Sequence, residues 1–381
     1  MNNFEFHNPT KILFGTDSMD KIANEIRPFG KKVLLTFGGG SIKKNGVYDK
    51  VIEQLKEFDV REFGGIEPNP RVETIREIIA KYRDFDPDFI LAVGGGSTAD
   101  GTKLLSSAMH YDGDAWDILV KPGSEPSKYV PFGVVLTLSA TGSEMNAGAV
   151  ITNWTTHQKL SFRRKQTYPV FSVLDPRNTY TVPKDQTAYG VIDTFSHVLE
   201  QYIQTAENIP LQDRFAEGLL LTLIENAHIA LENPTDYNAR ANITLSACLA
   251  LNDIIRSGTN QDWATHGIEH EVSAFYDIPH AAGLAIITPR WMKVVKDFKL
   301  KKLAHYGRRI WNLSGDDADV SELAISKTHE FFKSLGVKMS LGEWGITNEH
   351  FPTMVERLAK RGVGEKALTT DEITEILNSS L

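Results

Sequence analysis

The sequence contains one cysteine in 381 residues, Cys248, so no disulfide can form within the chain. This cysteine lies in the apolar run Leu245–Leu251, where a thiol behaves as a small core residue, and we do not expect it to be catalytic. No stretch approaches the roughly 18 consecutive apolar residues of a membrane span. The first residues, Met1–Phe6, lack the basic start and the apolar centre of a signal peptide. We therefore expect a cytoplasmic protein that does not enter a membrane.

The sequence also has no excess of basic residues. The formal net charge is −8 and the sequence pI is about 5.8, which disfavours nucleic acid or an anionic membrane as a partner. The two basic clusters, at 163–165 and 299–302, are short, and we expect them to be solvated surface. Apolar residues make up 41% and charged residues 24% of the chain, as in ordinary globular proteins. Its length predicts two domains.

Strands and helices alternate in the first half of the chain. We predict strands at 32–37, 60–63, 89–93, 132–137 and around Val173, with helices at 48–58, 72–82 and 99–109 between them. Such alternation predicts a parallel sheet that is covered on both faces. The opening stretch, 4–14, also has the pattern of a strand. It has no partner nearby in the sequence, so we expect it to pair with a second subunit in a homodimer.

The second half of the chain shows helical rather than strand periodicity. Apolar residues recur with a period near 3.6 at 215–231, 239–251 and 323–335. We therefore predict an α/β dinucleotide-binding domain over 1–183, with a parallel, Rossmann-like sheet, followed by an all-α domain over 184–381.

Two of the predicted strands end in Gly-Gly-Gly-Ser, at Gly38–Ser41 and Gly94–Ser97. Glycines let the backbone approach a ligand, and bare N–H groups at the start of a helix favour a phosphate. The second turn is equally consistent with a tight strand-to-helix connection, because Ser97 and Asp100 have the Ser-x-x-Asp spacing of a capping pair. Neither turn is a Gly-x-Gly-x-x-Gly fingerprint, so a standard Rossmann dinucleotide site is not indicated.

The residues after the first turn bear on the choice of nucleotide. An acidic residue there would bind the ribose 2′-OH and select NAD, but the run continues Ile42-Lys43-Lys44-Asn45. A 2′-phosphate would meet no carboxylate in this run, and the lysines could help to bind it. We therefore favour NADP(H) over NAD(H), with a plain loop as the alternative.

Hydroxyl side chains follow the strand at 132–137, in the run from Thr137 to Ser143. Such a row is typical of a capped helix start, but ligands bind at the carboxyl edge of a parallel sheet. Lys159 follows a polar turn and can be interpreted as a surface lysine.

Histidines and a carboxylate gather at helical spacings in the second half. Asp193 and His197 are four residues apart, as are His266 and His270, so each pair projects from one face of a helix. With His280, these residues could supply an Asp and up to three His to one divalent cation. Spacing alone leaves both a metal site and ordinary helix faces open.

At this point the chain resembles a known family, the iron-containing (group III) alcohol dehydrogenases, and especially their butanol dehydrogenase and NADPH-dependent aldehyde reductase branch. The matching stretches follow one another over nearly the whole chain, at 6–15, 38–46, 93–103, 139–146, 174–176, 193–200 and 266–280. The resemblance implies the dehydroquinate synthase-like fold of that family. It also implies hydride transfer between NAD(P)H and a small aldehyde or primary alcohol, assisted by one divalent metal, Fe²⁺ or Zn²⁺.

The resemblance also implies roles for individual residues. The implied metal ligands are Asp193, His197, His266 and His280, and His270 is implied to lie beside the substrate and the nicotinamide. The implied contacts of the adenosine are Gly38, Gly39 and Ser41, and those of the pyrophosphate are Gly95, Gly96, Ser97 and Asp100. The implied contacts nearer the nicotinamide are Thr137, Ser139, Ser143 and Lys159.

Other functions remain open from the sequence. One is a metal-dependent dehydrogenase of a polyol such as glycerol. Another is a cyclase similar to dehydroquinate synthase, which would need several basic residues facing the metal, and the sequence reveals no such cluster. A third is a non-catalytic nucleotide- or metal-binding module, against which the complete sets of ligand and glycine residues argue.

Overall fold

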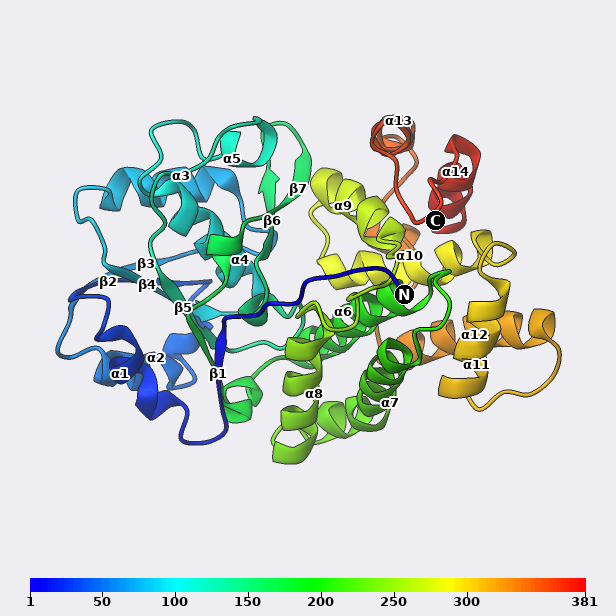
Figure 1. Ribbon diagram of the computed structural model, residues 1–381, viewed down its shortest axis with the longest axis horizontal. Coiled ribbons are helices and arrows are strands. Elements are labelled where there is room, and N and C mark those ends of the chain that lie inside the picture. The colour runs from blue at the N-terminus through cyan, green and yellow to red at the C-terminus, as the bar shows by residue number, and fades with distance from the viewer. The chain divides into compact units, whose positions relative to one another are not determined.

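The computed structural model describes residues 1–381, which form two compact units (Figure 1). The first, here the sheet unit, comprises His7–Pro183 and Pro234–Asn252. The second, here the helical unit, comprises Met1–Phe6, Lys184–Asn233 and Asp253–Leu381. All strands lie in the sheet unit.

Six parallel strands form the central sheet, in the order β1-β8-β5-β4-β2-β3. Their bounds, in that order, are Lys11–Phe14, Phe171–Leu174, Phe132–Leu136, Phe89–Gly94, Lys32–Phe37 and Asp59–Gly64. The predicted parallel sheet is confirmed. Every residue of β4 is buried, and strands covered on both faces need such unbroken apolar runs.

Helices cover both faces of the sheet (Figure 1). Successive side chains of β2 alternate between two core clusters, with Val33 and Leu35 in one and Leu34 in the other. The first cluster includes residues of α1 (Ile22–Ile26) and α2 (Val47–Gln54), and the second includes residues of α3 (Val72–Tyr82) and α4 (Gly96–Ala108). The sheet unit also contains α5 (Asp117–Val120) and α8 (Tyr237–Ala250).

A second, two-stranded sheet was not predicted. β6 (Gly148–Asn153) and β7 (Gln158–Arg163) form an antiparallel hairpin, and its apolar residues join the cluster that holds α3 and α4. The turn between the two strands, 154–157, contains neither glycine nor proline, so the usual hairpin signal is missing. His157 takes the left-handed conformation there, with φ of 48°. The predicted opening strand was too long, since β1 begins only at Lys11 and Met1–Phe6 belongs to the helical unit. The expectation that it lacks a partner within the chain was also wrong, because β1 pairs in parallel with β8.

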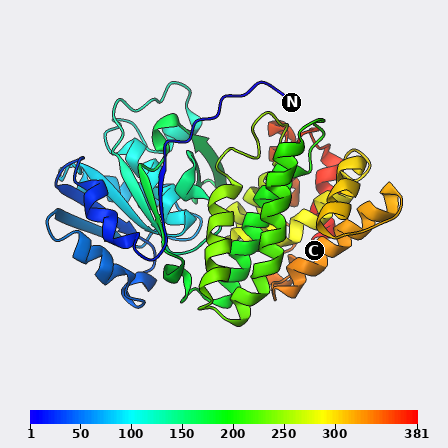
Figure 2. The same ribbon diagram turned by 60° about the horizontal axis from the view of Figure 1, so that its bottom comes forward.

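The helical unit contains no strand, as the sequence predicts, and Figure 2 shows its helices from another side. Its helices are α6 (Lys184–Tyr202), α7 (Pro210–Glu232), α9 (Ala264–Tyr276), α10 (His280–Val294), α11 (Leu300–Ile310), α12 (Asp317–Ser334), α13 (Phe351–Arg361) and α14 (Thr370–Ser379). The central helix is α6, which packs against α7 and α10 and is buried along most of its length. None of the helices has the length and apolar composition that a membrane span needs.

Candidate metal centre and nucleotide-binding turns

Three helices bring the four predicted metal ligands together in the helical unit. Asp193 and His197 project from one face of α6, His266 lies in the first turn of α9, and His280 is the first residue of α10. The Oδ1 atom of Asp193 lies 3.4 Å from Nδ1 of His197 and 3.8 Å from Nε2 of His280. The ring of His266 lies 4.5 Å from that of His197 and 5.2 Å from that of His280, centroid to centroid.

The donor atoms of this cluster fit a divalent cation. One donor atom from each of Asp193, His266 and His280 lies within 4.8 Å of the other two, and His197 lies beside this group but is not part of it. Nε2 of His266 is buried and has no hydrogen-bond partner, although buried polar atoms are nearly always paired. One carboxylate and three imidazoles are ligands that suit Fe²⁺ and Zn²⁺. The cluster therefore has the chemistry of a metal site.

Turns in the chain place His266 and His280 at the starts of their helices. Trp263, just before α9, adopts the left-handed conformation with φ of 62°, and its ring lies 5.3 Å from that of His266. At the other end of α9, Asp277 is also left-handed, with φ of 51°. Pro279 then precedes the first residue of α10, and its restricted φ suits the entry to a helix. Backbone geometry thus fixes where α9 and α10 begin, and with them the positions of both histidines.

Two buried glutamates lie behind the histidines, and the sequence analysis missed them. The Glu200 carboxylate accepts a hydrogen bond from Nδ1 of His266, and the Glu269 carboxylate accepts one from Nδ1 of His280. When Nδ1 carries the proton, Nε2 is left with a lone pair for a metal. A signal did exist in the sequence, because Glu200 lies seven residues after Asp193 and Glu269 three residues after His266, on the same helical faces.

The electrostatic surroundings of the histidines differ. Burial lowers the pKa of His197 well below its ordinary value, and the neighbouring His266 and His280 lower it further. For His266, burial also acts to lower the pKa, but the carboxylate of Glu200, helped by other carboxylates, outweighs it and raises the pKa. His197 is therefore held as the neutral imidazole, which is the form that binds metal.

His270 lies beside the cluster, as predicted. Its ring centroid is 5.4 Å from that of His280 and 6.3 Å from that of His266. It is less buried than His266, one turn earlier on α9.

In the sheet unit, the turn after β4 leads directly into α4. This helix begins at Gly96 with Gly95 as its N-cap, and no side chain caps it, so the predicted capping pair of Ser97 and Asp100 was wrong. A Cβ atom on Gly96 would lie 2.2 Å from Oγ1 of Thr141, so only glycine allows this close approach. The amide groups at the start of α4 are thus left without a side-chain cap, which suits an anion.

The turn after β2 lies next to it, because β2 and β4 are neighbours in the sheet. Gly40 is left-handed, with φ of 89°. A Cβ atom on Gly39 or Gly40 would meet nothing within 4 Å, so this turn borders open space. Both turns lie at the carboxyl edge of a parallel sheet, where nucleotides bind.

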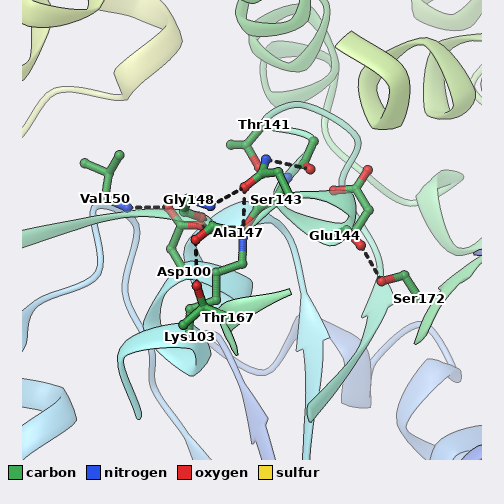
Figure 3. A network of polar contacts seen from close by, with 12 residues as sticks. Asp100, Lys103, Thr141, Ser143, Glu144, Ala147, Gly148, Val150, Thr167 and Ser172 are labelled. Carbon is green, nitrogen blue, oxygen red and sulfur yellow. Dashed lines mark hydrogen bonds and ion pairs between the residues drawn. The ribbon is translucent and has the colours of Figure 1, made fainter. Parts of the chain in front are cut away.

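Two predicted cofactor contacts, Asp100 and Ser143, bond to each other in a buried network (Figure 3). The hydroxyl of Ser143 donates to Oδ1 of Asp100 at 2.5 Å, and the N–H of Val150 donates to Oδ2 at 2.8 Å. Lys103 is 0% exposed and donates to Oγ of Ser143 at 2.7 Å and to the carbonyl of Gly148 at 2.6 Å. Burial lowers the pKa of Lys103 to about 8. The network ties the hydroxyl-rich turn to α4 and β6.

The remaining predicted contacts lie nearby in the sheet unit. Thr137 donates its N–H to the carbonyl of Gly94 at 2.9 Å. The hydroxyls of Ser139 and Thr244 share a hydrogen bond of 2.7 Å, which joins this turn to α8. Lys159 is buried and donates to Oδ1 of Asn69 at 2.9 Å, so its interpretation as a surface lysine was wrong.

A parallel sheet with open glycine turns at its carboxyl edge, and a helical unit that gathers one carboxylate and three histidines, together define the class of metal-dependent dehydrogenases. Comparison with known proteins gives the family. Residues 9–176 match the family model described as iron-containing alcohol dehydrogenase, and residues 187–381 match its C-terminal counterpart. The chain belongs to the iron-containing alcohol dehydrogenase family, as the resemblance predicts.

Curated relatives and a solved structure match this chain over nearly its full length. The chain is 46% identical to the NADPH-dependent aldehyde reductase YqhD of Escherichia coli, covering 95% of this chain and 94% of that protein. It is 44% identical to the probable NADH-dependent butanol dehydrogenase 1 of Bacillus subtilis, covering 100% of both. The crystal structure of NADH-dependent butanol dehydrogenase A from Thermotoga maritima is 38% identical, with a TM-score of 0.96, and the match covers 100% of this chain and 99% of that one. The predicted fold is therefore confirmed.

Proposed function

We propose that this protein is a metal- and NAD(P)-dependent alcohol dehydrogenase that interconverts a small aldehyde and its primary alcohol, of the butanol type. The observation that carries the proposal is the group of Asp193, His266 and His280, whose donor atoms lie within 4.8 Å of one another. Nε2 of His266 is buried there without a hydrogen-bond partner, and the ring of His197 lies 4.5 Å from that of His266. Membership of the family and relatives named as butanol dehydrogenases and an aldehyde reductase support it.

In this proposal Asp193, His197, His266 and His280 hold one divalent metal ion. The name of the family supports iron, and three histidines with one carboxylate also suit zinc. A divalent ion held there would polarise the carbonyl group and stabilise the negative charge that develops on its oxygen. His270 stands beside the cluster, where it can orient the substrate or supply a proton to its oxygen.

The proposed cofactor contacts follow the sheet edge. Gly38, Gly39 and Ser41 bind the adenosine side, Gly95, Gly96, Ser97 and Asp100 the pyrophosphate, and Thr137, Ser139, Ser143 and Lys159 the part nearer the nicotinamide. The uncapped start of α4 supports the pyrophosphate assignment. Asp100 uses its two carboxylate oxygens to accept from Ser143 and from the N–H of Val150. In this proposal Asp100 therefore serves the pyrophosphate site by holding the turn in shape, and the glycine amides and Ser97 contact the phosphates.

We propose NADP(H) as the preferred nucleotide. Lys43 extends over the rings of Phe37 and Tyr48, with Nζ 4.9 and 4.6 Å from their centroids. These contacts keep a cation close to the open glycine turn. The structure also brings Glu62 within 3.5 Å of this lysine, a carboxylate that the run after β2 does not contain. A 2′-phosphate would compete with Glu62 for Lys43, so the preference depends on the balance between these two residues.

Three wider features complete the proposal. The first is a homodimer, which is supported by the edge strand β1 with Phe14 exposed on it. The second is a division of the sequence into domains 1–183 and 184–381, which is supported by the family matches at 9–176 and 187–381, although Met1–Phe6 packs with the helical unit and Pro234–Asn252 with the sheet unit. The third is a cytoplasmic location, where a reducing compartment suits the lone, buried Cys248.

The test combines metal analysis with turnover. We expect the purified protein to contain about one Fe²⁺ or Zn²⁺ per chain and to oxidise NADPH faster than NADH with butanal in a panel of aldehydes. His266→Ala should lose both the metal and the activity, while the sheet unit still binds NADPH. Full turnover by metal-depleted His266→Ala protein would overturn the proposal. Faster turnover of glycerol than of butanol would favour a polyol dehydrogenase, and NADPH binding without any turnover would favour a binding module.

A further inference from the structure

The proposed reaction gives no role to the two buried glutamates behind the histidines, Glu200 and Glu269. We propose that Glu200 and Glu269 are positioning residues, which hold His266 and His280 with Nε2 facing the metal before any metal binds. This inference rests on the metal site of the proposed function and extends it to residues that touch neither metal nor substrate.

Glu200 is held by the first turn of α9. It lies on the same face of α6 as Asp193 and is 0% exposed. Its Oε1 atom accepts a hydrogen bond from the N–H of Thr265 at 2.6 Å, and its Oε2 atom accepts one from Nδ1 of His266. Both carboxylate oxygens are thus used by two consecutive residues. The start of α9 also carries the positive end of the helix dipole, which stabilises a buried carboxylate there.

Glu269 makes the equivalent arrangement one helix further on. It is 0% exposed, its Oε2 atom accepts a hydrogen bond from Nδ1 of His280, and its Oε1 atom accepts one from the hydroxyl of Ser273. Glu269 also lies close enough to His270 and His280 to be a ligand itself. Because each of its oxygens already accepts a hydrogen bond, we assign it to positioning.

Gly283 on α10 leaves the space that Glu269 occupies. A Cβ atom on Gly283 would lie 2.7 Å from Cγ and 3.1 Å from Oε1 of Glu269. The first distance is shorter than real Cβ contacts allow and the second is tight, so any larger residue would displace the Glu269 side chain. Glycine within a helix is otherwise unfavourable, and the glutamate explains its presence in the first turn of α10.

The two contacts form a series along the chain. α6 supplies Asp193, His197 and the carboxylate that holds His266, while α9 supplies His266 and the carboxylate that holds His280. α6 therefore orients the ligand on α9, and α9 orients the ligand on α10. Carboxylates that accept from the second nitrogen of a ligating histidine fix its tautomer and ring orientation.

The experiment measures metal affinity rather than turnover. Dissociation constants for Zn²⁺ and Co²⁺ are measured by competition with a chromophoric chelator for Glu200→Gln, Glu269→Gln and the unmodified protein. We expect a roughly 10–100-fold weaker affinity for each variant, as is typical for such partners, and an altered Co²⁺ visible spectrum. The matched control is Glu271→Gln, a buried glutamate on α9 that pairs with Arg357 and Arg361 instead of a histidine. Its affinity should be unchanged.

A second pair of variants tests the same point without touching a charge. Gly283→Ala should weaken metal binding by displacing Glu269, whereas Gly218→Ala on α7, where an added Cβ meets nothing within 4 Å, should leave it unchanged. Affinities for Glu200→Gln, Glu269→Gln and Gly283→Ala within twofold of the unmodified protein would overturn the inference. If the unmodified protein itself bound no divalent metal, the proposed function would fail instead.

Discussion

At the scale of the residue, the surroundings of a side chain change its pKa, and Glu144 shows this clearly. It is fully buried beside the thiol of Cys248, and burial raises its pKa to about 7. Between its ordinary pKa of 4.5 and 7, the folded protein therefore binds more protons than the unfolded chain. Its contribution to stability is present below pH 4.5 and is lost as the pH rises through 7. A shift of this size corresponds to about 3 kcal/mol at pH 8.

Glu144→Gln should therefore become more stable relative to the unmodified protein as the pH rises. The amide resembles the protonated acid at every pH, so the cost of ionising a buried carboxyl disappears. We expect the difference in Tm between variant and unmodified protein to increase from pH 5 to pH 8 in thermal unfolding. Glu330→Gln, which changes an exposed glutamate on α12, should show the same difference at both pH values. A constant difference for Glu144→Gln would contradict the prediction.

Lys43 is the residue that we expect to select the nucleotide. Lys43→Ala should weaken NADPH binding about tenfold, because a hydrogen bond to a charged group contributes roughly 1.5 kcal/mol, and should leave NADH binding within about twofold. Glu62→Gln should strengthen NADPH binding by removing the competing carboxylate. Titration of nicotinamide fluorescence measures the affinity of each variant and of the unmodified protein for both nucleotides. Lys56→Ala, which removes an exposed pair with Glu53, is the control and should change neither affinity. Equal losses for NADPH and NADH in Lys43→Ala would show that Lys43 does not contact a 2′-phosphate.

At the scale of the element, regular periodicity made strands and helices predictable. The buried strand at 89–93 and the helix at 72–82 were found as β4 and α3, because an unbroken apolar run or an even 3.6 spacing fits few alternative structures. The hairpin β6–β7 was missed, since its turn takes a left-handed His157 in place of glycine. A local sequence pattern therefore predicts a helix or strand when the residues of that element alone determine its structure.

The candidate site, too, was predicted only in part from the sequence. Asp193, His197, His266 and His280 were found because metal ligands are rare residue types at helical spacings and because the family is known. Glu200 and Glu269 were missed, although they share the same helical faces, since a glutamate on a helix is usually a solvated residue. Their burial depends on packing between helices, which a single sequence does not reveal. The wrong capping pair at Ser97 and Asp100 has the same cause, as Asp100 is used by Ser143 and Val150.

A buried lysine joins the ends of several elements in the helical unit. Lys299 precedes α11, is fully buried, and contacts Asp262 at 2.9 Å and Glu365 at 2.7 Å. It also donates to the carbonyl of Ile203 at 2.8 Å, just after α6. Asp262 in turn accepts a hydrogen bond from the N–H of Ala264, the first residue of α9.

Lys299→Met should destabilise the protein by about 3 kcal/mol, because it leaves two carboxylates poorly compensated inside the protein. Lys296→Met provides the comparison: it removes an exposed pair with Glu322 and should cost less than about 1 kcal/mol. Chemical unfolding followed by circular dichroism measures both changes. Equal effects of the two substitutions would mean that the buried cluster contributes no more than a surface ion pair.

At the scale of the whole molecule, the proposed metal ligands and the proposed nucleotide contacts belong to different units. Asp193, His197, His266 and His280 all lie in the helical unit, and both glycine turns lie in the sheet unit. A ligand stabilises the structure that binds it, by about 4 kcal/mol at a concentration of 1,000 times its Kd. Loss of the metal should therefore destabilise mainly the helical unit.

Removal of the metal by a chelator should increase hydrogen exchange in α6, α9 and α10 and leave β2 and β4 unchanged. The metal-free protein should still bind NADPH with an affinity close to that of the metal-loaded protein. Hydrogen exchange with mass spectrometry and fluorescence titration measure these two outcomes, and restoring the metal is the control. If chelation abolished NADPH binding, the two sites would be coupled, contrary to their placement in separate units.

The unit to which α8 belongs determines how this enzyme can be recombined with its relatives. The chain passes between the units at 6/7, 183/184, 233/234 and 252/253, so neither unit is one continuous piece. A graft of residues 7–183 alone would separate Ser139 from Thr244 and Glu144 from Cys248. Exchange of nucleotide preference between family members should therefore carry residues 234–252 along with the sheet. A single crossover at 183 would instead place one parent's α8 against the other parent's hydroxyl-rich turn.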